Sequence, residues 1–246
     1  IVVNTNPLYT PREMQHQFSD SGAETVVLLN TFYPKLQEIQ AQTQIKRVIV
    51  CRINDFIGFP SNRLVKRAQA KEGQWVDVPE GNGVYLMTSL LTKYAPTPPR
   101  IEVKPDDIAL FQYTGGTSGT PKAAMLSHRN LVANVVQCSY WLTDLELGYE
   151  IAMGAIPFFH VFGMTVAMAL CIYVGGKLVV VPNPRPIDNV MNQIQREKCT
   201  YFPGVPAMYI GIINHPDVSK YDLTSVRACI SGAAPLPVEV HESFEK

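Results

Sequence analysis

The stretch Tyr113-Thr114-Gly115-Gly116-Thr117-Ser118-Gly119-Thr120-Pro121-Lys122 lies between two short apolar runs, at residues 108–111 and 123–126. The runs predict two strands joined by a loop of glycines, hydroxyls and one lysine. Glycine at three positions lets the backbone adopt positive φ and approach a ligand closely, and successive N–H groups can form a concave anion site. Further donors come from Thr114, Thr117, Ser118, Thr120 and the Lys122 ammonium group. The loop therefore suits a polyphosphate; the alternative is a polar surface hairpin.

The spacing within this loop excludes a Walker A motif, which needs Gly, four residues and then Gly-Lys-Ser/Thr. Gly119 is followed by Thr120-Pro121-Lys122, and Lys122 is followed by Ala123. No hydroxyl therefore stands beside the lysine to hold Mg²⁺, and no long helix is expected directly after it. An ordinary P-loop NTPase is disfavoured.

Composition predicts a globular chain of one or two domains. Of the 246 residues, 46% are hydrophobic and 17% are charged, and the formal net charge is zero. A chain with this balance has no net positive charge that would attract nucleic acid or an anionic membrane. The five cysteines are far apart and odd in number, which favours reduced thiols in a cytosolic protein over a disulfide framework. The five histidines are also scattered, so no metal site is predicted.

The order of elements predicts an α/β fold. Thr10-Pro11-Arg12-Glu13 starts a helix that Gly22 ends, and residues 32–42 predict a second helix. Two apolar runs, at residues 25–29 and 47–51, predict buried strands. Alternation of helices with continuous apolar strands indicates layered, mostly parallel sheets that helices cover on both faces. The basic residues Arg63, Lys66, Arg67 and Lys71 predict a solvated helix face rather than a binding patch.

A proline-rich segment, Ala95-Pro96-Thr97-Pro98-Pro99-Arg100, predicts the boundary between two subdomains, at residues 1–100 and 101–246. Beyond it, Ser127 caps a helix, and strands are expected at residues 177–181, 200–202 and 227–230 with a helix at 187–198. Residues 151–176 carry no Asp, Glu, Lys or Arg. Pro157, His160 and Gly163 interrupt this stretch, which favours a strand, a turn and a fully buried helix over the alternative of a membrane span. Neither end looks natural, so we expect a fragment of a longer protein, truncated at both ends.

Five segments carry a resemblance. The loop at 113–122 resembles the phosphate loop of the adenylate-forming (AMP-binding) superfamily, and residues 157–164, 203–206 and 231–237 resemble later motifs of that family in the expected order. Residues 4–22 most closely resemble its long-chain fatty-acid–CoA ligase (acyl-CoA synthetase) branch. The chain departs from the family at Ala123 and Ala233, where glycine is usual. The resemblance covers nearly the whole chain and implies a fragment of the family's large N-terminal domain.

The resemblance implies that a carboxylic, fatty acid is activated with ATP to acyl-AMP and then to an acyl-CoA thioester. It implies catalytic roles for Lys122 and His160. The phosphates would contact Thr114, Gly115, Gly116, Thr117, Ser118, Gly119, Thr120 and Lys122, and adenine would contact Gly232, Ala233, Ala234 and Pro235. The acyl pocket would contain His160, Val161, Phe162, Gly163, Met164, Gly204 and Val205.

Several family parts are absent from the sequence. There is no Tyr-Gly-x-Thr-Glu motif, whose Glu holds Mg²⁺, no ribose-binding Asp and no small C-terminal domain with its catalytic lysine. The fragment alone is therefore expected to be inactive, and no metal ligand is assigned within it. The partners expected are the acid, ATP and coenzyme A, without nucleic acid, in the cytoplasm or peripherally at the inner face of a membrane. The alternatives are an aryl- or medium-chain acid ligase, a fatty-acyl-AMP ligase, and a nucleotide-binding fragment without catalysis. Chain length of the acid and oligomeric state stay open.

Overall fold

The computed structural model describes residues 1–114 and 121–245, and the chain divides into two compact units. Unit 1 comprises Ile1–Lys104 and Ala109–Met125, and unit 2 comprises Pro105–Ile108 and Leu126–Lys246. Both contain parallel strands alternating with helices, which confirms the predicted α/β class. The predicted subdomain division at residue 100 stays a prediction.

Unit 1 is built on a parallel sheet with the order β2-β3-β4. Its strands and the helices around them are β2 (Thr25–Leu29), β3 (Arg47–Cys51), β4 (Val84–Leu86), α1 (Pro11–Ser21), α2 (Tyr33–Ile39), α3 (Ser61–Lys71) and α4 (Met87–Lys93). Short 3₁₀ turns, Asn30–Phe32 and Gln40–Gln42, flank α2 and account for the longer helix expected from the sequence. The core of the unit joins α1 and α2 to the fully buried Val48 and Val50 of β3.

Strand β2 differs from the buried run that the sequence predicts. Val26 and Leu28 pack against the core, whereas the Val27 side chain is 57% exposed. Successive side chains of a strand point to opposite faces, so a continuous apolar run is buried on both sides only where both faces are covered. The four basic residues of the 61–71 segment are exposed on α3, as predicted.

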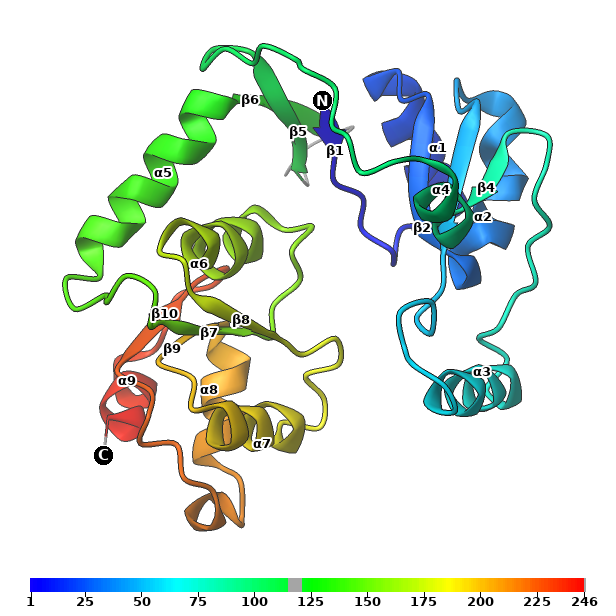
Figure 1. The fold of residues 1–246 in the computed structure, drawn as a ribbon. Helices are drawn as coiled ribbons and strands as arrows, with labels where there is room; N and C mark the ends of the chain where they lie inside the picture. The colour runs from blue at the N-terminus through cyan, green and yellow to red at the C-terminus, as the bar shows by residue number, and fades with distance from the viewer. Residues whose placement is uncertain (115–120, 246) are drawn as a thin grey trace. The chain divides into compact units, whose positions relative to one another are not determined.

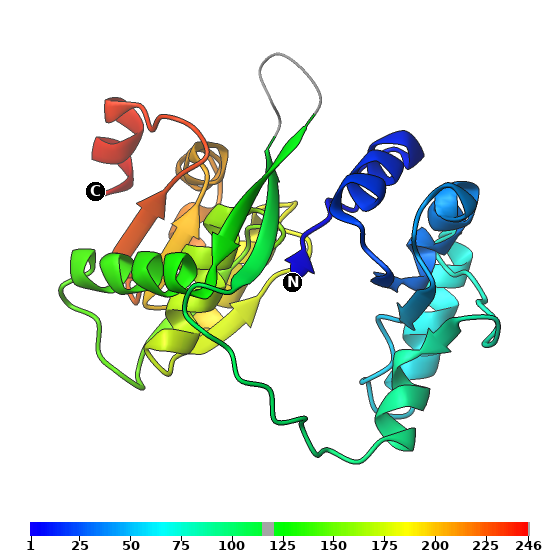
Figure 2. The ribbon, with the colours of Figure 1, turned by 90° about the horizontal axis from the view of Figure 1, so that it is seen from above.

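A second sheet, most of whose residues belong to unit 1, has the order β1-β5-β6 and is formed by β1 (Val2–Val3), β5 (Ile108–Thr114) and β6 (Lys122–Ser127). β1 pairs parallel to β5 with Val2 opposite Leu110. Figure 2 shows β5 and β6 side by side in green. The two strands expected to flank the loop are therefore present, and residues 115–120 lie outside the described residues.

Unit 2 contains a four-stranded parallel sheet with the order β10-β9-β7-β8. Its elements are α5 (His128–Trp141), β7 (Ile151–Gly154), η3 (Gly163–Ala169), α6 (Leu170–Tyr173), β8 (Lys177–Val180), α7 (Asp188–Glu197), β9 (Tyr201–Gly204), α8 (Pro206–Ile213), η4 (Val218–Lys220), β10 (Ala228–Ser231) and α9 (Val238–Phe244). Ser127 caps α5 in a capping box with Asn130, as predicted.

Both faces of this sheet are covered, as the continuous apolar strands predict. On one face Ala152 and Tyr201 pack with α5 and α6, and on the other Met153 and Phe202 pack with α7 and α8. Figure 1 shows α6 on one side of β7 and β8 and α7 and α8 on the other. The alternation between neighbouring residues of β7 and β9 gives a three-layer core.

The uncharged stretch at 151–176 forms β7, a turn and a helix that begins as the π-helical η3 and continues as α6. No helix among the described residues is long and apolar enough to span a membrane. The expected full burial of this helix is wrong for its last turn, where Ile172 and Tyr173 are 70% and 50% exposed. The helix is shielded from solvent where it packs on the sheet and on α5, and its last turn extends beyond this cover.

Candidate active site

The predicted phosphate loop is described at its two ends. Thr114 ends β5 and Lys122 begins β6, and both side chains are exposed. The Thr114 hydroxyl donates a hydrogen bond to the Lys122 carbonyl at 3.4 Å, so the two ends lie together. Among the predicted phosphate contacts, Gly115, Gly116, Thr117, Ser118, Gly119 and Thr120 fall outside the described residues.

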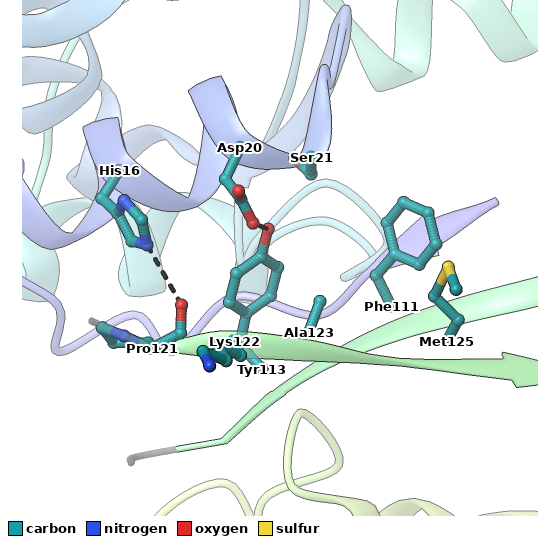
Figure 3. A pocket seen from close by; sticks show the side chains of 9 residues that line it. All are labelled: His16, Asp20, Ser21, Phe111, Tyr113, Pro121, Lys122, Ala123 and Met125. Carbon is teal, nitrogen blue, oxygen red and sulfur yellow. Dashed lines mark hydrogen bonds between the residues drawn. The ribbon is translucent and has the colours of Figure 1, made fainter. Parts of the chain in front are cut away.

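A cavity of about 480 Å³ lies in unit 1 beside these two strands. As Figure 3 shows, α1 contributes His16 and Asp20 to its lining, and β5 and β6 contribute Tyr113 and Lys122. Tyr113 is buried, and burial together with its hydrogen bond to Asp20 raises the pKa of its hydroxyl. Tyr113 is therefore a neutral hydrogen-bond donor at physiological pH.

In unit 2, the other predicted motifs follow the carboxyl ends of three parallel strands. Residues 157–164 follow β7, residues 203–206 end β9 and begin α8, and residues 231–237 follow β10. Because parallel strands present their carboxyl ends at one edge of a sheet, the three segments meet there. We call this set of residues the carboxyl edge. In open α/β sheets this is the edge at which ligands bind.

Two contacts join the segments at the carboxyl edge. The Gly232 N–H donates to the Gly204 carbonyl at 3.2 Å, which links the turns after β10 and β9. A Cβ on Gly232 would lie 2.6 Å from ring atoms of Phe162, which belongs to the segment after β7. Glycine at 232 is thus required for the Phe162 ring to lie against the backbone of this turn.

The segment after β7 turns sharply before η3. A Cβ on Gly163 would lie 2.4 Å from the carbonyl oxygen of Pro157, so only glycine fits there. The turn presents His160 as an exposed side chain whose ring centroid lies 4.6 Å from that of Phe159. π-Helical turns such as η3 are rare and frequent at functional sites. His160 is therefore accessible at the carboxyl edge rather than enclosed in the core.

The turn after β10 places Ala233 in the left-handed region, with φ of +67°. Side chains with a Cβ pay about 1–2 kcal/mol for this conformation, whereas glycine adopts it freely. This gives a physical reason for glycine to be usual at the position. Ala233, Ala234 and Pro235 are exposed, and the neighbouring Ser231 Oγ is buried without a hydrogen-bond partner among the described residues.

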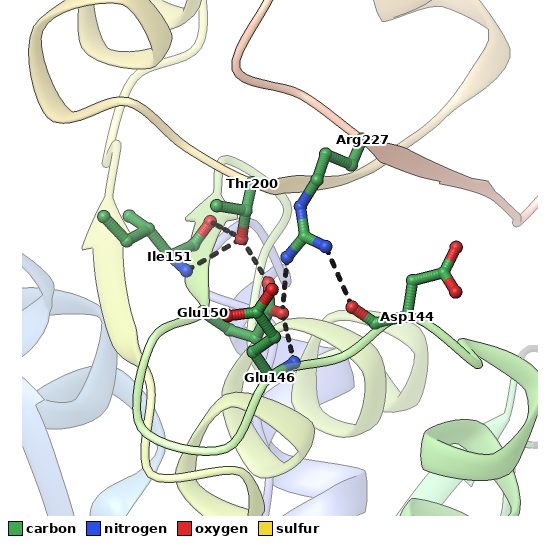
Figure 4. Close-up of polar contacts among 6 residues, drawn as sticks. All are labelled: Asp144, Glu146, Glu150, Ile151, Thr200 and Arg227. Carbon is green, nitrogen blue, oxygen red and sulfur yellow. Dashed lines mark hydrogen bonds and ion pairs between the residues drawn. The ribbon is translucent and has the colours of Figure 1, made fainter.

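The opposite, amino edge of the same sheet holds a polar cluster that the sequence motifs did not indicate. Glu150, Thr200 and Arg227 directly precede β7, β9 and β10, and Glu150 is only 1% exposed. Its carboxylate accepts hydrogen bonds from the Thr200 hydroxyl, from the Glu146 N–H at 2.7 Å and from the Arg227 guanidinium at 2.7 Å (Figure 4). Burial raises the pKa of Glu150, but these bonds together outweigh it and hold the pKa below its usual value.

The sequence offered one signal for this cluster: a charged or hydroxyl residue stands immediately before each of three apolar strands. For His16 and Asp20 the only signal was their spacing of four residues on a capped helix. Among the described residues no three His, Cys, Asp or Glu side chains lie close enough together to hold a metal ion.

The fold and both edges define a class of α/β protein in which three turns meet at the carboxyl ends of parallel strands. The model of the AMP-binding enzyme family matches residues 1–246, and the chain belongs to this family. It is 36% identical to a long-chain-fatty-acid–CoA ligase of Bacillus subtilis (strain 168), over 100% of this chain and 44% of the relative. The chain thus spans less than half the length of this curated relative.

Solved structures agree on the fold. A long-chain-fatty-acid–CoA ligase from Archaeoglobus fulgidus is 26% identical with a TM-score of 0.76, covering 98% of this chain and 42% of that one. An anthranilate–CoA ligase in complex with anthranoyl-AMP is 22% identical with a TM-score of 0.80, covering 100% of this chain and 43% of that one. The superfamily and the α/β architecture expected from the sequence motifs are confirmed.

Proposed function

We propose that the protein, at the family's full length, activates a carboxylic acid with ATP and transfers the acyl group to coenzyme A. A fatty acid is the favoured substrate class, because the Bacillus subtilis relative, named a long-chain-fatty-acid–CoA ligase, aligns with every residue of this chain. The observation that carries the proposal is the meeting of three family motifs at the carboxyl edge, through the Gly232–Gly204 hydrogen bond and the packing of Phe162 on Gly232.

In the first step a carboxylate oxygen attacks the α-phosphorus of ATP, and the bond to the departing pyrophosphate breaks. Two anions must approach, so the protein's task is to neutralise charge and align the reactants. In the proposal the loop at 114–120 and Lys122 hold the β- and γ-phosphates. A lysine–phosphate charge pair at ~4 Å and an effective dielectric near 20 is worth about 4 kcal/mol before desolvation.

In the second step the coenzyme A thiol attacks the acyl carbonyl, its proton passes to solvent, and AMP leaves. The proposal gives residues 232–235 the adenine face, where small side chains let a flat base lie against backbone. It gives His160 the approach of the carboxylate, and it gives Val161, Phe162, Gly163, Met164, Gly204 and Val205 the acyl pocket. Exposure of His160 and the glycine-dependent turn at Gly163 support this assignment.

Mg²⁺ would accompany ATP, and we assign none of its ligands to the described residues. The predicted cytoplasmic location and the peripheral association with a membrane stay predictions, as does the oligomeric state.

A pyrophosphate-release assay of the protein at the family's full length, across long-chain, medium-chain and aromatic acids, tests the proposal. We expect ATP- and coenzyme A-dependent turnover with fatty acids to exceed that with aromatic acids at least tenfold. Equal turnover across the panel would overturn the fatty-acid assignment, and no pyrophosphate with any acid would overturn the activity.

We also keep the alternative expected from the sequence, that the 246-residue chain by itself binds nucleotide. The isolated chain would then take nucleotide without reacting. Calorimetry with ATP and AMP separates nucleotide binding from an inert chain. Formation of acyl-AMP by the purified 246-residue chain would contradict the expectation that it cannot complete adenylation.

A further inference from the structure

The residues on either side of the phosphate loop are both tied to a single helix of unit 1. Tyr113, immediately before Thr114, donates from its hydroxyl to the Asp20 carboxylate at 2.5 Å. His16 donates from Nε2 to the carbonyl of Pro121, immediately before Lys122, at 3.1 Å. Figure 3 shows both hydrogen bonds running from α1 down to the two strands.

The spacing of the two helix residues matches this arrangement. His16 and Asp20 are four residues apart, so they lie on one face of α1 about one turn from each other. Asp20 reaches Tyr113, the last residue but one of β5, and His16 reaches Pro121, the residue just before β6. Tyr113 is 7% exposed and Asp20 is exposed, so the hydrogen bond ties a buried hydroxyl to a carboxylate at the protein surface.

Helix α1 is itself firmly held, which makes it a suitable support. Thr10 and Glu13 form a capping box at its start, and Gly22 ends it in the left-handed conformation. Met14 and Phe18, on the face away from the strands, are buried in the core of unit 1. Gln17 Nε2 also donates to the Asn4 carbonyl at 2.8 Å, which fixes the chain that follows β1.

We propose that His16 and Asp20 are positioning residues that clamp Tyr113 and Pro121 to α1, and so set where the adjacent Thr114 and Lys122 present their phosphate-binding groups. This proposal rests on the function proposed above for that loop. Neither residue touches substrate; each acts through the end of the loop that it holds. A misplacement of about 1 Å in a positioned group can cost roughly 100-fold in rate, so the clamp matters more for phosphate binding than for folding.

Loss of the clamp should weaken the binding only of ligands that carry the phosphates assigned to the loop. ATP and pyrophosphate carry the groups assigned to the loop, whereas AMP lacks the β- and γ-phosphates. A merely structural role would weaken ATP and AMP binding alike. A positioning role instead weakens the productive use of ATP and leaves AMP affinity unchanged.

The test compares Tyr113→Phe and His16→Leu with the wild type, in the protein at the family's full length. The matched control is Tyr221→Phe, because Tyr221 donates an equivalent hydrogen bond to Asp188 at 2.8 Å in unit 2. His16→Gln keeps an N–H donor and serves as the conservative variant. We expect kcat/KM for ATP to fall 10- to 100-fold in the first two variants, with the AMP dissociation constant within twofold of wild type. His16→Gln should recover most of the loss, and Tyr221→Phe should show none.

Hydrogen exchange of the ligand-free protein provides a readout that does not depend on activity. We expect faster exchange in peptides covering residues 111–126 of Tyr113→Phe and His16→Leu, and wild-type exchange in Tyr221→Phe. Unchanged exchange, or equal losses of ATP and AMP binding, would overturn the clamp. If the wild type makes no acyl-AMP, the proposed function fails, and the exchange data still decide whether the clamp exists.

Discussion

The two edges of the four-stranded sheet in unit 2 are built from the same three strands and differ in how their polar groups are satisfied. At the amino edge, the buried Glu150 accepts from Thr200, Arg227 and the Glu146 N–H. At the carboxyl edge, His160 is exposed, Ala233 has a left-handed backbone and Ser231 Oγ is buried without a partner among the described residues. A saturated cluster stabilises the fold, whereas accessible and strained groups are what a ligand site requires.

The largest expected loss of unfolding free energy comes from a substitution at the amino edge. Glu150→Gln removes the charge that Arg227 and Thr200 face, and breaking a buried pair typically costs about 3–5 kcal/mol. Because the Arg227 side chain is 43% exposed, we expect a loss at the lower end, about 3 kcal/mol, measured by urea unfolding. The control is Glu24→Gln, whose partners Lys46 and Arg47 are more than half exposed and which should cost much less stability than Glu150→Gln. Equal losses in both variants would remove the contrast between a buried and a surface carboxylate.

The next largest expected loss of unfolding free energy comes from a substitution at the carboxyl edge, where activity should fall as well. Gly163→Ala forces a Cβ to within 2.4 Å of the Pro157 carbonyl, so the backbone of the His160 turn must shift. We expect a loss of about 2 kcal/mol in unfolding free energy and a fall of at least tenfold in kcat/KM for the acid. Gly211→Ala is the matched control. Gly211 lies within helix α8, where alanine is favoured, and a Cβ there would lie 3.7 Å from the Ile187 side chain, an ordinary contact distance. Wild-type activity in Gly163→Ala would show that this turn does not shape the site.

Acid titration probes the amino edge again. The folded pKa of Glu150 is depressed, so its carboxylate stabilises the protein above the unfolded-state pKa of about 4.3 and this stabilisation is lost as pH falls through the folded value. We expect stability to decline below about pH 4.3 by at most about 1.4 kcal/mol per pH unit from this group. Glu150→Gln should flatten that part of the profile. A Glu150→Gln profile parallel to that of the wild type would contradict the assignment.

The smallest effect concerns the strained turn. Ala233→Gly removes the left-handed penalty on a Cβ, but glycine also gains conformational freedom in the unfolded chain. We therefore expect a net stabilisation below about 1 kcal/mol, seen as a small rise in Tm. Ala234→Gly, at the next position of the same turn, serves as the control and should not raise Tm. A clear destabilisation by Ala233→Gly would refute the strain at this position.

Local rules predicted much of the fold because they depend on adjacent residues. The helix start at Thr10, its end at Gly22 and the cap at Ser127 follow from side chains that bond their own backbone, and each is present. The burial of β2 was mispredicted because an apolar run does not state which sheet face is covered. The burial of the last turn of α6 was also mispredicted, because an uncharged run does not state which side of a helix is covered.

The sequence predicted which segments contribute to the candidate site, but it did not predict which of their residues are in contact. The sequence placed motifs after three strands, but the packing of Phe162 on Gly232 joins residues 70 positions apart and has no local signature. The left-handed Ala233 was visible only as a departure from a family pattern. Tyr113–Asp20 and His16–Pro121 link residues 93 and 105 positions apart, so only the fold brings them together.

In the proposed function the carboxyl edge binds the reactants, whereas the amino edge stabilises the fold. The most direct measurement compares His160→Ala with Glu150→Gln in the protein at the family's full length, recording acyl-AMP formation at 25 °C and Tm for each. We predict that His160→Ala lowers kcat/KM at least 100-fold with Tm within about 1 °C of wild type, a loss of the size that a preorganised group contributes. Glu150→Gln should lower Tm by several degrees with kcat/KM within threefold. Wild-type acyl-AMP formation in His160→Ala would contradict the catalytic role proposed for the carboxyl edge.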